Sequence, residues 1–428
     1  MLDRRSVMQN VFKWVILAAL LAGAAACQSV LGGATVAIPS DTPAATPQPV
    51  ESTTPLPTAD LSGLTIWIPP AFRSDSNSRA GEVFNRRIDA FEALHPGTTI
   101  GVRIKAAGGS GGLRDSLAAA IAAAPGAIPD LVALDQFDLR AAAIKDLIRP
   151  LDGLLPAGAW DSYYPYAKSI VTVDGRRFGL PFTGDAIVLA GTLVPYPTPR
   201  RWTDSGVGTS PMFAPLADSR ALFMFFGYYA AGGAPLLSTA DARIEPEPLA
   251  LALTWLQAMQ QDGVLKPRSL QLDSFESSFL AIESVGDSSV TLYSIASRSN
   301  DYFLGHLPTP EGEAFSLATS WSWAVAASDP ARQMLAAEMM SWLSDPAFLA
   351  EWTEAQGIMP PGRSALELLA AGNRRELVSS ISEKALPFPD DEILVFAGPV
   401  FSKAARRVLI DGVSPEDSAQ EASKAIHP

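Results

Sequence analysis

The sequence has one cysteine, Cys27, and three histidines among its 428 residues. A single cysteine excludes a disulfide framework within the chain and a thiolate metal cluster. His95, His306 and His427 are far apart and match no metal-ligand spacing, so we expect no metal and no cofactor. Basic residues are also few, because 32 Lys and Arg stand against 45 Asp and Glu and give a net charge of −13. A broad nucleic-acid binder needs the opposite sign, so we expect no nucleic-acid partner.

Catalytic signatures are also scarce. The sequence contains neither H-E-x-x-H nor S-x-x-K. The glycine-rich stretch 108–112 lacks the lysine of a phosphate-binding loop. Pairs of Asp and Glu could form the dyad of a glycosidase, but a sequence does not fix the distance between two carboxylates. We therefore predict that the protein is not an enzyme.

The N-terminus has the pattern of an export signal. Arg4, Arg5 and Lys13 precede an apolar run from Trp14 to Ala26, which has 13 residues. A bilayer-spanning helix needs about 20 residues, so this run fits a signal peptide over 1–26. Small residues then precede Cys27, which resembles the lipidation site of bacterial lipoproteins. The alternative is an ordinary cleaved signal with an incidental cysteine.

Residues 27–60 have the composition of a tether. Six prolines fall between Pro39 and Pro57 among Ser and Thr, and such a segment is extended and forms no core. A lipid anchor at Cys27 followed by this tether would hold a globular body near the membrane. The predicted location is the cell envelope, either on the outer face of the cytoplasmic membrane or in the periplasm.

The body from Leu61 onward alternates β-rich and helical patterns. Expected strands are 64–68, 99–104 and 130–134, and expected helices are 84–94, 113–124 and 136–147. This alternation predicts an α/β lobe with a mainly parallel sheet, whose ligands lie beyond the carboxyl ends of the strands. Asp329-Pro330, Asp345-Pro346 and Ser414-Pro415 each have the pattern of a helix start, and Gly357 that of a helix end.

From 61 to 426 the body resembles the bacterial extracellular solute-binding proteins of family 1, of which maltose-binding protein is the best-known member. The resemblance rests on the order of several segments: 64–67, 84–97, 129–134, 174–181, 307–312, 337–346 and 357–361. The chain departs from the family after Asp185, where 188–193 run straight to 199–204 without the usual Tyr-Asn-Lys stretch and helix. This departure alters the second lobe on its cleft side.

The resemblance implies a class II periplasmic-binding-protein-like fold. It has two α/β lobes, each with a mainly parallel sheet flanked by helices, and a ligand cleft between them. Lobe 1 would combine 61–183 with 312–356, and lobe 2 would combine 184–311 with 357–428. Closure of such lobes is driven by contacts that the ligand makes only in the closed state.

Three tryptophans and a serine are candidate ligand contacts. Trp67 ends the first expected strand, where an indole can stack on a sugar and donate its N–H to a hydroxyl. Trp321 and Trp323 are two residues apart and share one face of a strand, while Ser322 takes the other. We expect one of these two rings to contact ligand. Core packing is the alternative for each indole.

Three polar residues and a tyrosine complete the candidate set. Asp135 and Gln136 follow the third strand, and Asp185 follows the segment 181–184. Both aspartates match cleft-edge positions of the family, and a carboxylate accepts several hydrogen bonds from a polyol. A helix cap or a solvated loop acid is the alternative for each. Tyr293, in the expected strand 290–293, is a further candidate.

These observations favour a monomeric solute-binding lipoprotein of an ABC importer. It would capture a small-molecule solute, most simply a sugar or oligosaccharide, by lobe closure and deliver it to the permease subunits. Two alternatives stay open at this point: an extracellular carbohydrate-active enzyme and the ligand-binding component of a sensor.

Overall fold

The computed structural model describes residues 61–73, 77–191, 200–204, 212–215, 221–234, 243–263, 265–268, 289–297 and 302–425. The predicted signal peptide and tether, with Cys27, lie outside these residues, as does 192–199 of the atypical segment. Among the helices that the structure describes, none combines the length and apolarity that a membrane crossing requires.

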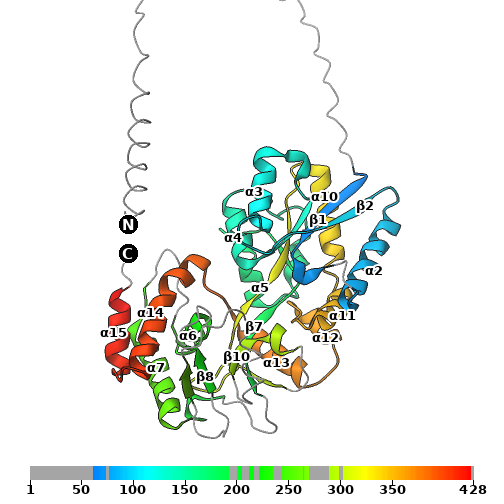
Figure 1. Ribbon diagram of the computed structural model, residues 1–428. Coiled ribbons are helices and arrows are strands. Elements are labelled where there is room, and N and C mark those ends of the chain that lie inside the picture. Colours follow the sequence, from blue (N-terminus) through cyan, green and yellow to red (C-terminus); the bar gives the residue numbers. More distant parts are fainter. Residues whose placement is uncertain are drawn as a thin grey trace, which may run out of the picture. The chain divides into compact units, whose positions relative to one another are not determined.

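A five-stranded sheet has the strand order β2-β1-β3-β13-β6, and Figure 1 shows β1 beside β2. The strands are β1 (Gly63–Ile68), β2 (Thr99–Ile104), β3 (Leu131–Asp135), β6 (Leu180–Pro181) and β13 (Trp321–Val325). β1 is parallel to β2 and to β3, whereas β13 is antiparallel to β3 and to β6. The three strands predicted from the sequence are therefore present and form the parallel part of this sheet.

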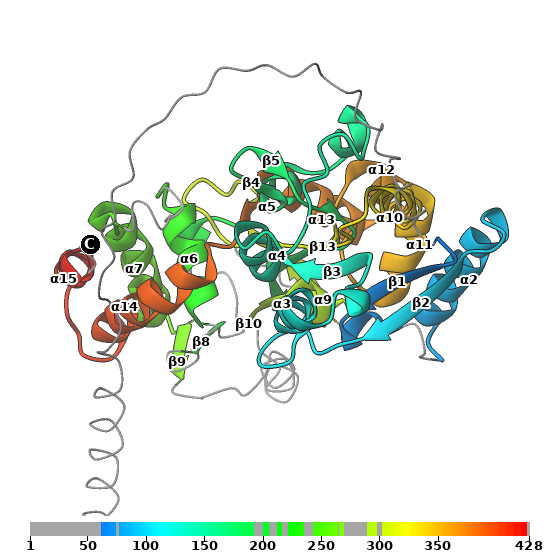
Figure 2. The ribbon, with the colours of Figure 1, turned by 90° about the horizontal axis from the view of Figure 1, so that it is seen from above.

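Helices cover both faces of this first sheet. Figure 2 shows α3 and α4 on one face and α2, α10 and α11 on the other, in agreement with Figure 1. Their bounds are α2 (Arg79–Leu94), α3 (Leu113–Ala123), α4 (Gln136–Ile144), α10 (Pro330–Trp342) and α11 (Pro346–Gln356). The predicted starts of α10 and α11 are confirmed, because Asp329 and Asp345 accept N–H hydrogen bonds there. Gly357 ends α11 with a φ of 71°, as expected for a left-handed C-terminal position.

A second sheet has the strand order β10-β7-β12-β14, and β11 also pairs with β7. Its strands are β7 (Asp185–Gly191), β10 (Ser289–Leu292), β11 (Phe303–Gly305), β12 (Leu317–Thr319) and β14 (Leu386–Pro387). β7 is antiparallel to β10, β11 and β12, and only β12 and β14 are parallel. The remaining strands of the described residues form two short pairs: β4 (Thr172–Val173) with β5 (Arg176–Arg177), and β8 (Met212–Pro215) with β9 (Leu265–Arg268).

The second sheet separates two apolar clusters. Ala186, Val188 and Ala190 of β7 belong to the first cluster, which also holds the core of the first sheet. Ile187 and Leu189 point to the opposite face and belong to the second cluster. Helices near the first cluster are α5 (Pro165–Ile170), α9 (Tyr293–Ala296), α12 (Arg363–Leu368) and α13 (Asn373–Lys384). The second cluster is built by α6 (Ala221–Ala231), α7 (Pro246–Gln261), α14 (Asp391–Leu409) and α15 (Pro415–Ala425).

The expectation of mainly parallel sheets is corrected by the strand pairing. Among the described strands, the second sheet is mostly antiparallel, and the first is mixed. The physical reason is the path of the chain between the sheets. β13 runs against the other strands of the first sheet, and β7 runs against the other strands of the second. The predicted lobe boundaries stay a prediction. The apolar clusters group Met359, Val378 and Ile381 with the first sheet, although the prediction put 357–428 in lobe 2.

A buried ion pair ties the first sheet to α10. The Asp130 side chain is 3% exposed. Its carboxylate accepts hydrogen bonds from Arg332 Nε at 2.7 Å and from Arg332 Nη2 at 2.6 Å. The same carboxylate accepts the Thr65 N–H at 2.8 Å, and Arg332 Nη2 also donates to the Gly63 carbonyl. Two-point contacts of this kind fix geometry as well as charge, so β1, β3 and α10 are held together at one place.

Candidate functional site

The chain passes between the two sheets at adjacent segments, 181–185 and 319–321. Phe182 donates its N–H to the Trp321 carbonyl at 3.0 Å, and Trp321 donates its own N–H to the Thr183 hydroxyl at 3.1 Å. Gly184 exchanges two backbone hydrogen bonds with Met359, at 2.7 and 3.0 Å. A Cβ at Gly184 would overlap the buried hydroxyl of Tyr166, so only glycine fits here without rearrangement.

Strand pairing brings three of the predicted residues to this passage. Trp321 lies opposite Asp135 in the β13–β3 pair, and Thr319 lies opposite Asp185 in the β12–β7 pair. Because Thr319 and Trp321 are two residues apart, Asp135 and Asp185 lie on either side of this segment. The carboxyl end of β3 and the beginning of β7 therefore lie across the 319–321 segment from each other, and ligand binding at this edge stays a prediction.

Trp321 is the one candidate tryptophan that keeps some exposed surface. Phe72, in the short turn of helix Pro70–Phe72 after β1, packs edge-on against it with ring centroids 5.4 Å apart. Phe72 also packs edge-on against Phe182 at 5.3 Å. Aromatic neighbours hold the indole in one orientation and leave part of its surface open. Such a ring can stack on the apolar face of a sugar.

Asp135 has two structural contacts. Its side chain accepts the Asp138 N–H at 2.8 Å, which makes it the N-cap of α4, the alternative reading of this residue. Burial raises the pKa of Asp135 to about 6, against hydrogen bonds from the Asp138 and Phe137 N–H groups that lower it. The Arg114 guanidinium, 2.9 Å from Asp138, also favours the ionised form of Asp135. A carboxyl with this pKa is a stronger acceptor above pH 6 than below it.

Asp185 is held at the beginning of β7 by the first turn of α9. Its carboxylate accepts the Ser294 N–H at 3.0 Å, the Ala186 N–H at 2.8 Å and the Ser294 hydroxyl. Burial nevertheless raises the pKa of Asp185 to about 6, because these donors only partly offset desolvation. Asp135 and Asp185 are therefore both acids whose charged form the fold disfavours, a property common at functional sites.

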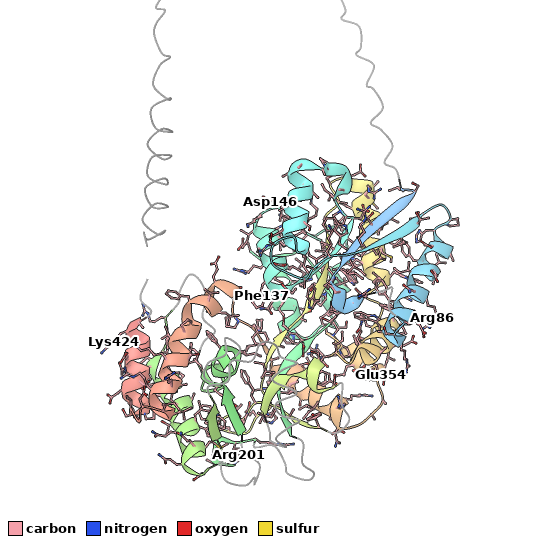
Figure 3. The ribbon with its side chains drawn as sticks, in the orientation of Figure 1. Arg86, Phe137, Asp146, Arg201, Glu354 and Lys424 are labelled. Carbon is pink, nitrogen blue, oxygen red and sulfur yellow. The ribbon has the colours of Figure 1, made fainter. Side chains whose placement is uncertain are left out.

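Tyr293 lies next to Asp185 and lines a cavity of about 530 Å³. Burial raises its pKa, and the phenol interacts with Arg374. The cavity is bounded by α9, the end of α11 and the α12–α13 connection, and Glu354, labelled in Figure 3, lies at its α11 side. Its size is in the range of small-molecule sites. The structure thus joins Tyr293 to Asp185 on one side and to a hollow on the other.

The remaining predicted residues are buried. Trp67, Ser322 and Trp323 are 2%, 0% and 1% exposed, which matches the core-packing alternative for the two indoles. Trp323 stacks on Phe182 with ring centroids 4.2 Å apart, and Lys105 Nζ is 4.6 Å from the ring centroid of Trp67. The Nε1 atoms of both indoles and Ser322 Oγ lack a hydrogen-bond partner among the described residues. A direct ligand contact at these three positions stays a prediction.

Gln136 contacts the connection that follows β14, and its contact with ligand stays a prediction. Its Nε2 donates to the Phe388 carbonyl at 3.0 Å, and Arg140, one turn later on α4, pairs with Asp390 at 3.2 Å. Phe137, labelled in Figure 3, packs against the second apolar cluster. These contacts join α4 to the β14–α14 connection.

Sequence reasoning missed Arg374, Arg375 and Arg140. Arg374 and Arg375 lie in a polar helix whose apolar pattern is weak, and Arg140 was one surface charge among many. The signal in the sequence was Gly372-Asn373 before the Arg374-Arg375 pair, because a glycine before a helix often precedes an anion site.

The described residues hold no group of three or more His, Cys, Asp and Glu arranged to bind a metal. The residues Gly108, Ser110 and Gly112 match the hydrolase sequence motif G-x-S-x-G. Gly108 and Ser110 are exposed and Gly112 is buried, in the turn between β2 and α3. His95 contacts Glu338, and His306 contacts the Leu307 carbonyl. Neither contact supplies a base to Ser110.

The family model for bacterial extracellular solute-binding proteins matches residues 86–373, more than half of the chain. The chain belongs to this family. The resemblance found in the sequence is thereby confirmed. No curated protein sequence matches the chain.

Three solved structures with the same fold are distant from this chain in sequence. The sugar-binding protein MalE from Xanthomonas citri has a TM-score of 0.68 at 17% identity, over 85% of this chain and 95% of that one. A cyclic α-maltosyl-1,6-maltose binding protein from Arthrobacter globiformis has 0.67 at 17%, over 85% and 97%. UgpB from Mycobacterium tuberculosis, solved with glycerophosphocholine, has 0.62 at 15%, over 85% and 97%. The two-lobed α/β fold predicted for this member of the family is therefore confirmed.

Proposed function

We propose that this solute-binding protein is the capture component of an ABC importer for a sugar or oligosaccharide. It binds its solute between two lobes, closes on it and delivers it to permease subunits without chemical conversion. The family supports solute capture. The similar structures from Xanthomonas citri and Arthrobacter globiformis are named as sugar-binding proteins, which supports a carbohydrate.

One observation carries the proposal for a sugar. Trp321 is a partly exposed indole in paired strands, with Asp135 and Asp185 on either side. A sugar presents an apolar ring face and a rim of hydroxyls, which need an aromatic surface and hydrogen-bond acceptors respectively. In this reading Trp321 stacks on the ring, and the two carboxylates accept hydroxyl protons. Tyr293, beside Asp185, supplies a phenol at the same edge.

Ligand titration tests this function. The purified chain is titrated with mono- and oligosaccharides, amino acids and polyamines, while tryptophan fluorescence and melting temperature are followed together. A saturable change with one sugar class, lost in Trp321→Ala and kept in Trp202→Phe, supports the proposal. Trp202 packs on Trp255 with ring centroids 5.7 Å apart in the second cluster, so it serves as a matched control. A response to amino acids alone, or no response, would refute the assignment to sugars.

The same preparation separates transport from the two alternatives. Product analysis after prolonged incubation with oligosaccharides should recover them intact, whereas hydrolysis would indicate a carbohydrate-active enzyme. Uptake of the labelled solute by cells should be lost when the gene is deleted. Intact uptake in the deletion strain, with loss of a solute-dependent transcriptional response, would indicate a sensor.

We also propose that Cys27 anchors the mature protein by a lipid to the cell envelope. The carrying observation is the apolar run 14–26 followed by the only cysteine and a proline-rich tether. Membrane fractionation tests this proposal. The wild-type chain should sediment with membranes, and Cys27→Ala should be released into the soluble fraction. Equal sedimentation of both forms would refute lipidation at this residue.

A further inference from the structure

The cavity beside Tyr293 is lined by two guanidinium groups. The proposed binding of a neutral sugar gives these groups no role. Arg374 and Arg375, in the first turn of α13, both line its 530 Å³ volume. Among the described residues that line the cavity, the charged ones are Arg374, Arg375 and Glu354, which sum to a net positive charge in a protein of net charge −13. This excess of positive charge is local, because the chain as a whole is acidic.

Both arginines make internal contacts at the cavity wall. Arg375 Nη1 donates to the Leu369 carbonyl at 3.0 Å, and Arg374 interacts with the Tyr293 phenol. A guanidinium has five N–H donors, and the bond from Arg375 to the Leu369 carbonyl uses one of them. These contacts also fix both arginines at the wall of the cavity, which lowers the entropy lost on binding.

The backbone at the same wall favours negative charge as well. α13 has 12 residues and begins after Gly372, which has no side chain to cap it. Gly372, Asn373, Arg374 and Arg375 all line the cavity. The N-terminus of a helix carries a partial positive charge, which adds to that of the two arginines.

We propose that this cavity binds the anionic group, a phosphate or carboxylate, of an organic solute. The proposal rests on the proposed function and narrows it, because Tyr293 belongs to both sites. The solute would then be an acidic or phosphorylated polyol. Its hydroxyls would lie toward Asp185 and its anionic group toward Arg374 and Arg375. Tyr293 lies between the Asp185 carboxylate, which accepts hydrogen bonds, and the two arginines, which donate them. The solute would bind in this orientation because the Asp185 carboxylate repels an anionic group.

The volume agrees with an organic anion and not with a bare ion. A cavity of about 530 Å³ is within the range of roughly 300–1,000 Å³ for small-molecule sites. A single phosphate ion fills only a small part of such a space. Leu366, Leu369 and Val378 provide apolar wall on which a carbon skeleton can pack.

The test compares charged probes with their neutral counterparts on the full chain. Glycerol 3-phosphate, glucose 6-phosphate and glucuronate are titrated by calorimetry against glycerol and glucose, at low and at high salt. We expect at least one charged probe to bind about tenfold or more tightly than its neutral counterpart, and to weaken with salt.

Arg374→Gln and Arg375→Gln should each abolish that preference, whereas Arg375→Lys should keep part of it and show that the fold is intact. Lys384→Gln is the matched control. It removes one positive charge from the other end of α13, outside the cavity lining, and should leave the preference unchanged.

Two outcomes would overturn the proposal, and they differ from each other. If neutral sugars bind and the Arg→Gln variants change nothing, the anion site is wrong and the proposed function stands. If neither charged nor neutral probes bind, the proposed function itself fails, and the anion site falls with it.

Discussion

Replacing Asp185 with asparagine should stabilise the protein at neutral pH and weaken its binding of solute. The carboxyl has its pKa raised from 3.8 to about 6 in the folded protein, mainly by burial. A folded-state pKa above the unfolded value means that the folded chain holds a proton that the unfolded chain has lost. The contribution of Asp185 to stability is therefore complete below about pH 4 and is lost as pH rises through about 6.

The size of the effect follows from the shift. About two pKa units at 1.36 kcal/mol each give a loss of about 3 kcal/mol between pH 4 and pH 8. Asp185→Asn removes the titration and keeps an oxygen that can accept the N–H groups of Ala186 and Ser294. Relative to wild type, the variant should therefore gain about 3 kcal/mol in its free energy of unfolding over that pH range.

Urea unfolding followed by circular dichroism at half-unit steps from pH 4 to pH 8 measures this difference directly. Ser294→Ala serves as a directional control. Loss of the Ser294 hydroxyl removes a donor to the charged form, so the pKa of Asp185 should rise further and the loss of stability should move to higher pH. A difference between Asp185→Asn and wild type that does not change with pH would refute the reasoning.

Affinity should move in the opposite direction. If Asp185 accepts solute hydroxyls, removal of its charge costs about 1.5–3 kcal/mol of hydrogen bonding, or roughly tenfold to a hundredfold in Kd. A variant that is more stable and yet binds less is the signature of a group retained for function. A variant that is more stable and binds equally well would show that Asp185 only holds the first turn of α9 and does not contact solute.

Three further changes test the fold around the site. Asp130→Ala leaves the Arg332 guanidinium without its carboxylate and should cost about 3 kcal/mol or more in urea unfolding; a loss below 1 kcal/mol would contradict the role of this pair. Gly184→Ala should cost about 1–3 kcal/mol because its Cβ overlaps the Tyr166 hydroxyl, and Tyr166→Phe should restore part of the melting temperature in the double variant. Trp321→Phe should lower the fluorescence response to solute while leaving the melting temperature of the free protein within about 2–4 °C.

The residues at the ends of strands could be placed from the sequence because their signals are local. Asp135 directly follows four apolar residues that form β3, so its position at the carboxyl edge needs only the strand itself. Asp329 and Asp345 precede prolines at helix starts, and both act as caps in the structure. Helix caps and strand ends depend on neighbouring residues in the sequence, and the pairing of strands that are far apart in the chain does not change them.

Pairing and burial depend on distant segments and could not be predicted in this way. β7 is antiparallel to three strands that come up to 134 residues later, and its alternate residues enter two different clusters. α13 was missed because only Val378, Ile381 and Ser382 of its twelve residues are buried. A helix with so few buried positions has little apolar periodicity, yet it supplies the two arginines of the cavity.

The two neighbouring tryptophans show what decides function within one strand. Alternation correctly put Trp321 and Trp323 on one face of β13, but it treats them as equivalent. They differ in distance from the passage between the sheets. Trp321 pairs with Asp135 at the end of β3 and keeps exposed surface, whereas Trp323 pairs with Ala133 and is covered by Phe182. A ligand that approaches the end of β3 meets the first ring and reaches the second only if Phe182 moves, so substitution of Trp323 should affect stability before affinity.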